Sequence, residues 1–218
     1  MSREIEELTT VAAFLDLVSG QRGHFRLESG HHGELWLDLD PLFAQPSRIE
    51  PFVAGLARAI RPYGVTTVCG PLLGGAFLAQ LVARALDAEF AFTERVMPSE
   101  PAGLYPARYR LPAALVGRVS GKRVAIVDDV MSAGSALRGT DAELRAHGAV
   151  PVVAGALLVL GSTGADYFAG RGLPVEAVVR DDYPLWSPAD CPLCAAGVPL
   201  ESVTLPENSE STREGNAP

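Results

Sequence analysis

The stretch VAIVDDVMSAGSA, residues 124–136, joins a short apolar run to two adjacent acids and then to a turn of small residues. Its apolar run, 124–127, is continuous rather than alternating, which is typical of a strand buried on both faces of a parallel sheet. The residues that follow predict a helix from about Ser135 to His147, with Gly148 just beyond its end. The stretch therefore predicts a strand, a turn and a helix of an α/β fold.

The turn has the properties of an anion site. Ligands of open α/β sheets bind at the carboxyl ends of the strands, and this turn follows such an end. Its backbone N–H groups can converge on an anion because no bulky side chain intervenes, and the helix N-terminus adds roughly half a positive charge. Two serine hydroxyls can donate further hydrogen bonds. The expected phosphate cradle consists of Ser132, Ala133, Gly134, Ser135 and Ala136.

The adjacent acids Asp128 and Asp129 need a different partner, because carboxylates repel a phosphate. They can accept hydrogen bonds from vicinal sugar hydroxyls or coordinate a hard cation such as Mg²⁺. A phosphate site and a diol or metal site thus lie a few residues apart, and a ribose 5-phosphate fits both. The alternative interpretation is a solvated acid pair beside a turn that only permits tight packing.

The remainder of the chain alternates strands and helices, which argues for a mostly parallel sheet covered on both faces. Strands are expected at 24–30, 34–39, 65–69, 89–93, 150–160 and 175–179. Further helices are expected at 4–18, 46–60 and 76–86. We expect a single domain over 1–205, with a hood at about 1–45, a core at about 46–182, an extension at 183–205 and a disordered tail at 206–218.

Composition restricts the classes of partner. The chain has 218 residues and a formal net charge of −8, which disfavours general nucleic-acid binding. No apolar run approaches the ~20 residues needed to cross a bilayer, and the charged N-terminus lacks the layout of a signal peptide. Three cysteines do not make a disulfide framework, so the cytoplasm is the expected compartment. We therefore expect neither a nucleic-acid nor a membrane partner.

Residues 124–136 resemble the phosphoribosyl-pyrophosphate (PRPP) signature of the type I phosphoribosyltransferases: a hydrophobic strand, two acids, an apolar pair, then small hydroxyl residues around a glycine. The resemblance implies that Asp128 and Asp129 hold the ribose hydroxyls, together with Mg²⁺ bound through PRPP, and that 132–136 cradle the 5-phosphate. The family pattern favours threonine where Ala133 and Ala136 stand, so this cradle relies more on backbone donors.

Two other segments are similar to the same family. The turn 70–75 looks like its pyrophosphate loop, which implies contacts to the leaving group from Leu72, Leu73, Gly74 and Gly75. Residues 23–30 and 35–38 are similar to the opening of orotate phosphoribosyltransferases, where this segment forms a hood over the base. The resemblance spans roughly residues 5–180. It implies a glycosyltransferase of the pentosyltransferase class, a homodimer with Mg²⁺ as cofactor, that transfers ribose 5-phosphate to orotate in pyrimidine nucleotide biosynthesis.

The stretch 96–115 is long for a connection between strands and falls where the orotate group carries its mobile catalytic loop. From Arg95 to Arg123, both included, the chain has six cations and a single acid, Glu100. A cationic lid of this kind would neutralise the charges of PRPP. We expect Arg95 to act in catalysis and Arg108 and Arg110 to bind the anionic substrate.

The chain departs from the orotate pattern where that pattern has lysines: it has Glu28, Gly74 and the pair Glu94-Arg95. Arginine can replace lysine as a phosphate clamp but not as a proton donor. Two alternatives stay open, a phosphoribosyltransferase for another base and a non-catalytic protein that responds to PRPP. A metal hydrolase is a third, with Asp38 and Asp181-Asp182 as the further acids at strand ends.

The motif Cys191-Pro192-Leu193-Cys194 has the spacing of half a zinc site. No second cysteine pair exists, and Cys69 and the four histidines are scattered along the sequence. The sequence therefore favours a packed turn near Trp186 over a zinc site. The dipeptide His31-His32 is expected to be exposed in the hood, where it could touch a base.

Overall fold

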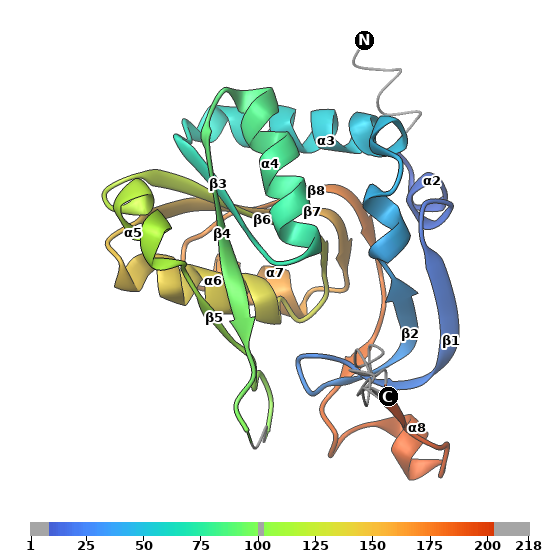
Figure 1. The fold of residues 1–218 in the computed structure, drawn as a ribbon. Coiled ribbons are helices and arrows are strands. Elements are labelled where there is room, and N and C mark those ends of the chain that lie inside the picture. Colours follow the sequence, from blue (N-terminus) through green and yellow to red (C-terminus); the bar gives the residue numbers. More distant parts are fainter. Residues whose placement is uncertain (1–8, 100–102, 203–218) are drawn as a thin grey trace, which may run out of the picture.

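The computed structural model describes residues 9–99 and 103–202, which form a six-stranded and a four-stranded sheet (Figure 1). The strands are β1 (Ser19–Arg26), β2 (His32–Asp38), β3 (Thr67–Pro71), β4 (Glu89–Val96), β5 (Arg108–Arg110), β6 (Arg123–Met131), β7 (Val150–Leu160), β8 (Val175–Asp181), β9 (Leu185–Trp186) and β10 (Glu201–Ser202). The α-helices are α2 (Val11–Leu15), α3 (Pro46–Ile60), α4 (Gly74–Leu86), α5 (Ala113–Val119), α6 (Ser135–Ala146), α7 (Thr163–Ala169) and α8 (Pro192–Ala195). Short 3-10 helices occupy Asp40–Phe43 and Arg61–Tyr63.

The larger sheet has the strand order β5-β4-β3-β6-β7-β8, and β6 lies between β3 and β7. Every neighbouring pair is parallel except β4 and β5, which form an antiparallel hairpin. Register pairs Cys69 of β3 with Ile126 of β6. The carboxyl ends of β3 and β6 therefore meet at one edge of the sheet, as the mostly parallel α/β fold requires.

The residues of β6 alternate between two hydrophobic cores, one on each face of the sheet. Ala125 and Val127 belong to the core formed with α3 and α4, whereas Val124 and Ile126 belong to the core formed with α5, α6 and α7. Figure 1 shows the two sets of helices on opposite faces of the sheet. All four side chains are fully buried, which explains why the run is continuously apolar.

The four-stranded sheet is the hood, and it combines the two ends of the described chain. Its order is β10-β1-β2-β9. The N-terminal strands β1 and β2 form an antiparallel hairpin, with β10 parallel to β1 and β9 antiparallel to β2. The extension expected at 183–205 thus completes the hood, a pairing that the sequence did not indicate. The tail expected at 206–218 lies outside the described residues.

Several element boundaries differ from the sequence-based expectations. The ladder to β7 continues as far as Met131, so β6 includes both acids rather than ending before them. Within the described residues the first helix covers only Val11–Leu15, rather than extending to residue 18, and β1 begins at Ser19. The stretch expected to be a lid contains β5 and the start of α5. In the described ranges no helix is both long and apolar enough to cross a membrane.

Candidate active site

The two acids lie side by side at the carboxyl end of β6, and Asp129 is only 8% exposed. The Asp129 N–H donates to Asp128 Oδ1 at 3.1 Å, and the Val130 N–H donates to Asp129 Oδ1 at 2.7 Å. Burial raises the pKa of both carboxyls, and repulsion by Asp129 raises the pKa of Asp128 further. Two adjacent carboxylates, of which Asp129 is buried and Asp128 half-buried, need a cation or hydroxyl donors to stay charged, and a diol or Mg²⁺ supplies these.

The glycine turn between β3 and α4 packs directly against these acids. A Cβ atom at Gly75 would lie 2.7 Å from Asp128 Oδ1, and one at Gly74 would overlap Asp129 Oδ2. A side chain at either position would therefore push the acids out of place. This contact gives a physical reason for glycine at position 74, where the orotate pattern has lysine. The peptide bond between Leu72 and Leu73 is cis, and Leu73 is 64% exposed.

The turn 132–134 connects β6 to α6, so the helix N-terminus lies at the same edge of the sheet as the acids. The N-cap is Gly134 at φ +72°, and no side chain caps the helix. The first-turn N–H groups of a helix have no acceptor within it, so they can serve an anion. Ala133 is buried, and the Gly164 N–H donates to the Ser132 carbonyl, which anchors the turn to α7. The expected cradle residues therefore surround an uncapped helix start.

The hood reaches the site through Glu28. Glu28 Oε2 lies 3.0 Å from Arg95 Nη1, while Oε1 accepts from the Tyr109 hydroxyl at 2.8 Å and from Ser135 Oγ at 3.3 Å. Tyr109 is 6% exposed, and burial raises the pKa of its hydroxyl. The sequence-based reading missed Tyr109. It reaches this position because the β4–β5 register pairs it with Arg95, which no local signal in the sequence reveals.

The other cations singled out in the sequence lie apart from this network. Arg108 and Arg110 flank Tyr109 on β5, and both are exposed. Because side chains alternate along a strand, they point to the opposite face from Tyr109. The connection from β4 to β5 contacts the hood, since the Tyr105 N–H donates to the Ser29 carbonyl at 2.9 Å. Of the three arginines expected at the site, Arg95 contacts Glu28, whereas Arg108 and Arg110 do not.

The paired histidines do not have the exposure that the sequence predicts. His31 is 8% exposed because its ring packs against the ring of Tyr105, and His32 is 3% exposed because its ring packs against that of His24. His31 Nδ1 lies 3.1 Å from Ser29 Oγ. His32 lies beside Cys194, from the motif that the sequence favoured as a packed turn.

Comparison with known proteins gives matches over most of the chain. A model of the phosphoribosyl transferase domain matches residues 47–168. The orotate phosphoribosyltransferase of Thermotoga maritima is 32% identical over 82% of this chain and 88% of its own length. That of Thermus thermophilus is 32% identical over 83% of this chain and 92% of its own.

Solved structures agree on the fold. The orotate phosphoribosyltransferase of Aeropyrum pernix has a TM-score of 0.57 at 22% identity, covering 76% of this chain and 88% of that one. The adenine phosphoribosyltransferase of Thermoanaerobacter pseudethanolicus has a TM-score of 0.60 at 15% identity, covering 78% of this chain and 99% of that one. Taken with the strand-end acids and the uncapped helix start, these matches show that the chain belongs to the phosphoribosyltransferase family.

Proposed function

We propose that this protein transfers ribose 5-phosphate from PRPP to orotate, giving orotidine 5′-phosphate and pyrophosphate in pyrimidine nucleotide biosynthesis. The observation that carries the proposal is the acid pair at the end of β6, next to an uncapped helix start and a glycine turn at the same sheet edge. The choice of orotate rests on the curated relatives that bear this activity in their names, at 27–33% identity.

Each part of the site has a role in this reaction. Asp128 and Asp129 accept hydrogen bonds from the ribose 2- and 3-hydroxyls, residues 132–136 hold the 5-phosphate, and 72–75 hold the pyrophosphate. The bond from the anomeric carbon to the pyrophosphate oxygen breaks and its electron pair leaves with pyrophosphate, while a ring nitrogen of orotate supplies the pair of the new bond and loses its proton to solvent. The transition state resembles an oxocarbenium ion, so correct positioning and neutralised pyrophosphate matter more than proton transfer.

Magnesium fits the donor set of the site. Hard cations prefer carboxylate oxygens, and burial raises the pKa of both Asp128 and Asp129, an effect that a cation bound beside them would offset. When bound with PRPP, Mg²⁺ would offset negative charge on the substrate. The residues that would approach it are the two aspartates.

The cations of the β4–β5 hairpin complete the proposal. Arg95 meets Glu28 beside the site, and in the presence of PRPP its guanidinium can turn to the pyrophosphate as that group gains charge. Arg108 and Arg110 are exposed, so they can attract the anionic substrate or contact it after the hairpin moves.

The test incubates the protein with PRPP, Mg²⁺ and a panel of bases that includes orotate, uracil and adenine, and measures pyrophosphate release. We expect turnover with orotate. Turnover with another base but not with orotate would identify that base as the acceptor. PRPP binding without turnover on any base would favour a non-catalytic protein that responds to PRPP. A protein with Asp128→Asn and Asp129→Asn, purified in the same way, controls for enzyme carried over from the expression host.

The proposal includes a homodimer in the cytoplasm. The homodimer rests on the resemblance and on the apolar side chain of Phe77 near the start of α4, which is 48% exposed. The cytoplasm rests on the low cysteine content of the chain. Light scattering on the purified protein measures its mass, and we expect twice the 23.0 kDa of one chain.

A further inference from the structure

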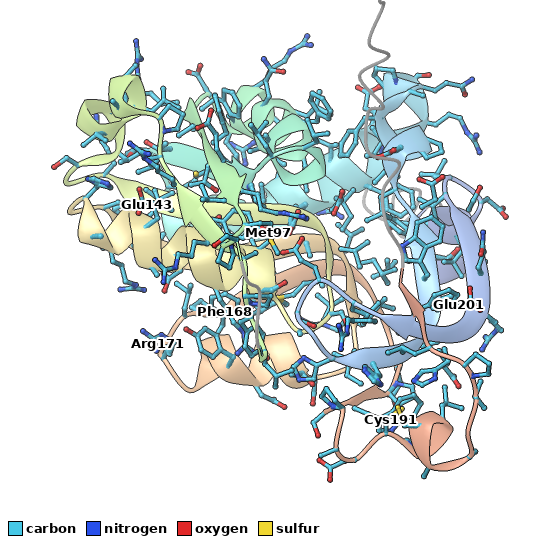
Figure 2. All side chains as sticks on the ribbon, turned by 60° about the horizontal axis from the view of Figure 1, so that its bottom comes forward. Met97, Glu143, Phe168, Arg171, Cys191 and Glu201 are labelled. Carbon is cyan, nitrogen blue, oxygen red and sulfur yellow. The ribbon has the colours of Figure 1, made fainter. Side chains whose placement is uncertain are left out.

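Four potential metal ligands converge in the hood, although they are far apart in the sequence. They are His24 of β1, His32 of β2, and Cys191 and Cys194 at the start and inside of α8, and their ligand atoms all lie within 4.8 Å of one another. Figure 2 shows Cys191 where the C-terminal segment meets the hood strands. His24, His32 and Cys191 are each at most 3% exposed.

The distances fit one tetrahedral metal ion. Zinc bonds of about 2.3 Å to sulfur and about 2.0–2.1 Å to nitrogen place two tetrahedral nitrogens about 3.3 Å apart and a nitrogen and a sulfur about 3.6 Å apart. His24 Nε2 lies 3.2 Å from His32 Nδ1 and 3.3 Å from Cys191 Sγ. Cys194 Sγ lies 3.3 Å from His32 Nδ1 and 3.7 Å from His24 Nε2.

Hydrogen bonding alone does not account for this arrangement. His24 Nε2 faces three neighbouring groups, His32 Nδ1 and the two sulfurs, and one nitrogen has only one proton or lone pair to offer. His24 Nδ1 lies 2.9 Å from the Val198 carbonyl, to which it donates. The other nitrogen, Nε2, then carries a lone pair aimed into the cluster, which is the orientation of a metal-bound histidine held by an outer hydrogen bond.

The ligand types select zinc among the common metals. Two thiolates and two imidazoles in tetrahedral geometry are typical of zinc or of an iron–sulfur centre. In a two-iron cluster of the Rieske type the histidines and cysteines bind different irons, so their ligand atoms lie at opposite ends. Here nitrogen and sulfur atoms are 3.3 Å apart, which a single ion explains. Two thiolates neutralise Zn²⁺, so no net charge is buried.

A metal at this position would fasten the two ends of the described chain together. The C-terminal strands β9 and β10 contribute two residues each to the hood sheet, and ladders this short are weak on their own. His32 also directly follows the turn 27–31, which carries Glu28 to Arg95 and Ser135. Tying β1 and β2 to α8 therefore sets the position of the hood over the site.

We propose that His24, His32, Cys191 and Cys194 bind one structural Zn²⁺ that holds the C-terminal segment on the hood. Binding releases the two thiol protons to solvent and leaves both imidazoles neutral. The site supplies no open coordination position, so it takes no part in the transfer reaction itself.

The first test measures metal in tag-free protein purified without chelator under reducing conditions. We expect one zinc per chain by elemental analysis, and a visible absorption of tetrahedral cobalt–thiolate type after exchange for Co²⁺. The variant Cys191→Ser with Cys194→Ser should hold less than about a tenth of that zinc. Wild-type protein without zinc that also takes up no Co²⁺, or a double variant that retains the full zinc content, would overturn the proposal.

Two control variants match the ligand types. Cys69→Ala removes the third cysteine, which is buried in β3 outside the cluster, and His147→Asn removes a histidine on the C-terminal side of α6. Both should keep one zinc per chain. Should the double variant fail to fold, thiol titration of the native wild type decides. Cys191 and Cys194 should react only after a chelator extracts the metal, and a Cys191–Cys194 disulfide in the reduced preparation would contradict the proposal.

Discussion

The β6–α6 turn and the hood each bring several polar side chains together. Those of the turn are neighbours in the sequence, whereas those of the hood are far apart in it. The acids and the cradle occupy nine consecutive residues, 128–136, whose geometry follows from one strand, one turn and one helix. The four ligands of the hood include His24 and Cys191, which are 167 positions apart and meet only when the fold closes. The first site offers hard oxygen ligands and backbone amides, whereas the second offers sulfur and nitrogen.

The largest effect is expected from removing the charge of the acid pair, because this changes the first region and leaves the hood intact. With Asp128→Asn and Asp129→Asn, we expect PRPP in the presence of Mg²⁺ to bind about 100- to 1000-fold more weakly, because amides are poorer partners for diols and cations. Isothermal titration calorimetry measures the affinity. Asp181→Asn with Asp182→Asn is the matched control, since it changes another adjacent acid pair at a strand end and should bind PRPP normally. Unchanged affinity in the first variant would remove the acids from the site.

A smaller loss is expected from Arg95→Ala. Arg95 is next to Glu28 and only two residues from Thr93, whose carbonyl accepts from the Leu72 N–H at 2.8 Å, in the turn that we propose to hold pyrophosphate. We expect kcat/KM for PRPP to fall about 10- to 100-fold, with partial recovery in Arg95→Lys, because lysine keeps the charge but not the planar fork. Arg118→Ala, which loses an exposed ion pair to Glu89, is the control. Equal kinetics in the two alanine variants would exclude Arg95 from catalysis.

The acid pair should also lower stability when no substrate is bound. Burial raises the pKa of Asp129 to about 6, so the folded state holds its proton more tightly than the unfolded chain does. The free energy of unfolding therefore falls as the pH rises from about 4 to about 6. At pH 7.5 without ligand, Asp129→Asn should be more stable than wild type by about 1–2 kcal/mol, and at pH 4 the gain should disappear.

Urea unfolding at the two pH values measures this effect, and Asp182→Asn is the control on an exposed residue. A variant that is less stable than wild type at pH 7.5 would mean that the carboxylate of Asp129 is satisfied within the protein. The raised pKa of Asp129 would then give no support to a site for a cation or a diol. Asp129→Asn should therefore show both the gain in stability and a loss of PRPP binding.

The difference between the two regions also sets how much the sequence could predict. The parallel sheet and the strand–turn–helix at 124–136 were predictable because burial pattern, small residues and helix signals are local. The strand was expected to end before Asp128, and the structure extends it to Met131 because the ladder with β7 continues, which depends on a distant strand. The position of Tyr109 depends on the register of β4 and β5, and the contact of His24 with Cys191 depends on the two ends of the described chain coming together. No local sequence pattern predicts either of them.

Glu28 is the point where the two regions meet, and Glu28→Gln should give the smallest effect. Its carboxylate accepts from Ser135 Oγ at the helix start, where the 5-phosphate is expected, so the two anions compete. The Glu28 side chain is 34% exposed, and water screens much of the repulsion. Glutamine keeps the shape and removes the charge, so we expect KM for PRPP to fall about threefold with kcat unchanged. Glu34→Gln, on the same hairpin beside Arg22, should leave KM as it is, whereas a higher KM in Glu28→Gln would mean that the carboxylate still supports the site when PRPP is bound.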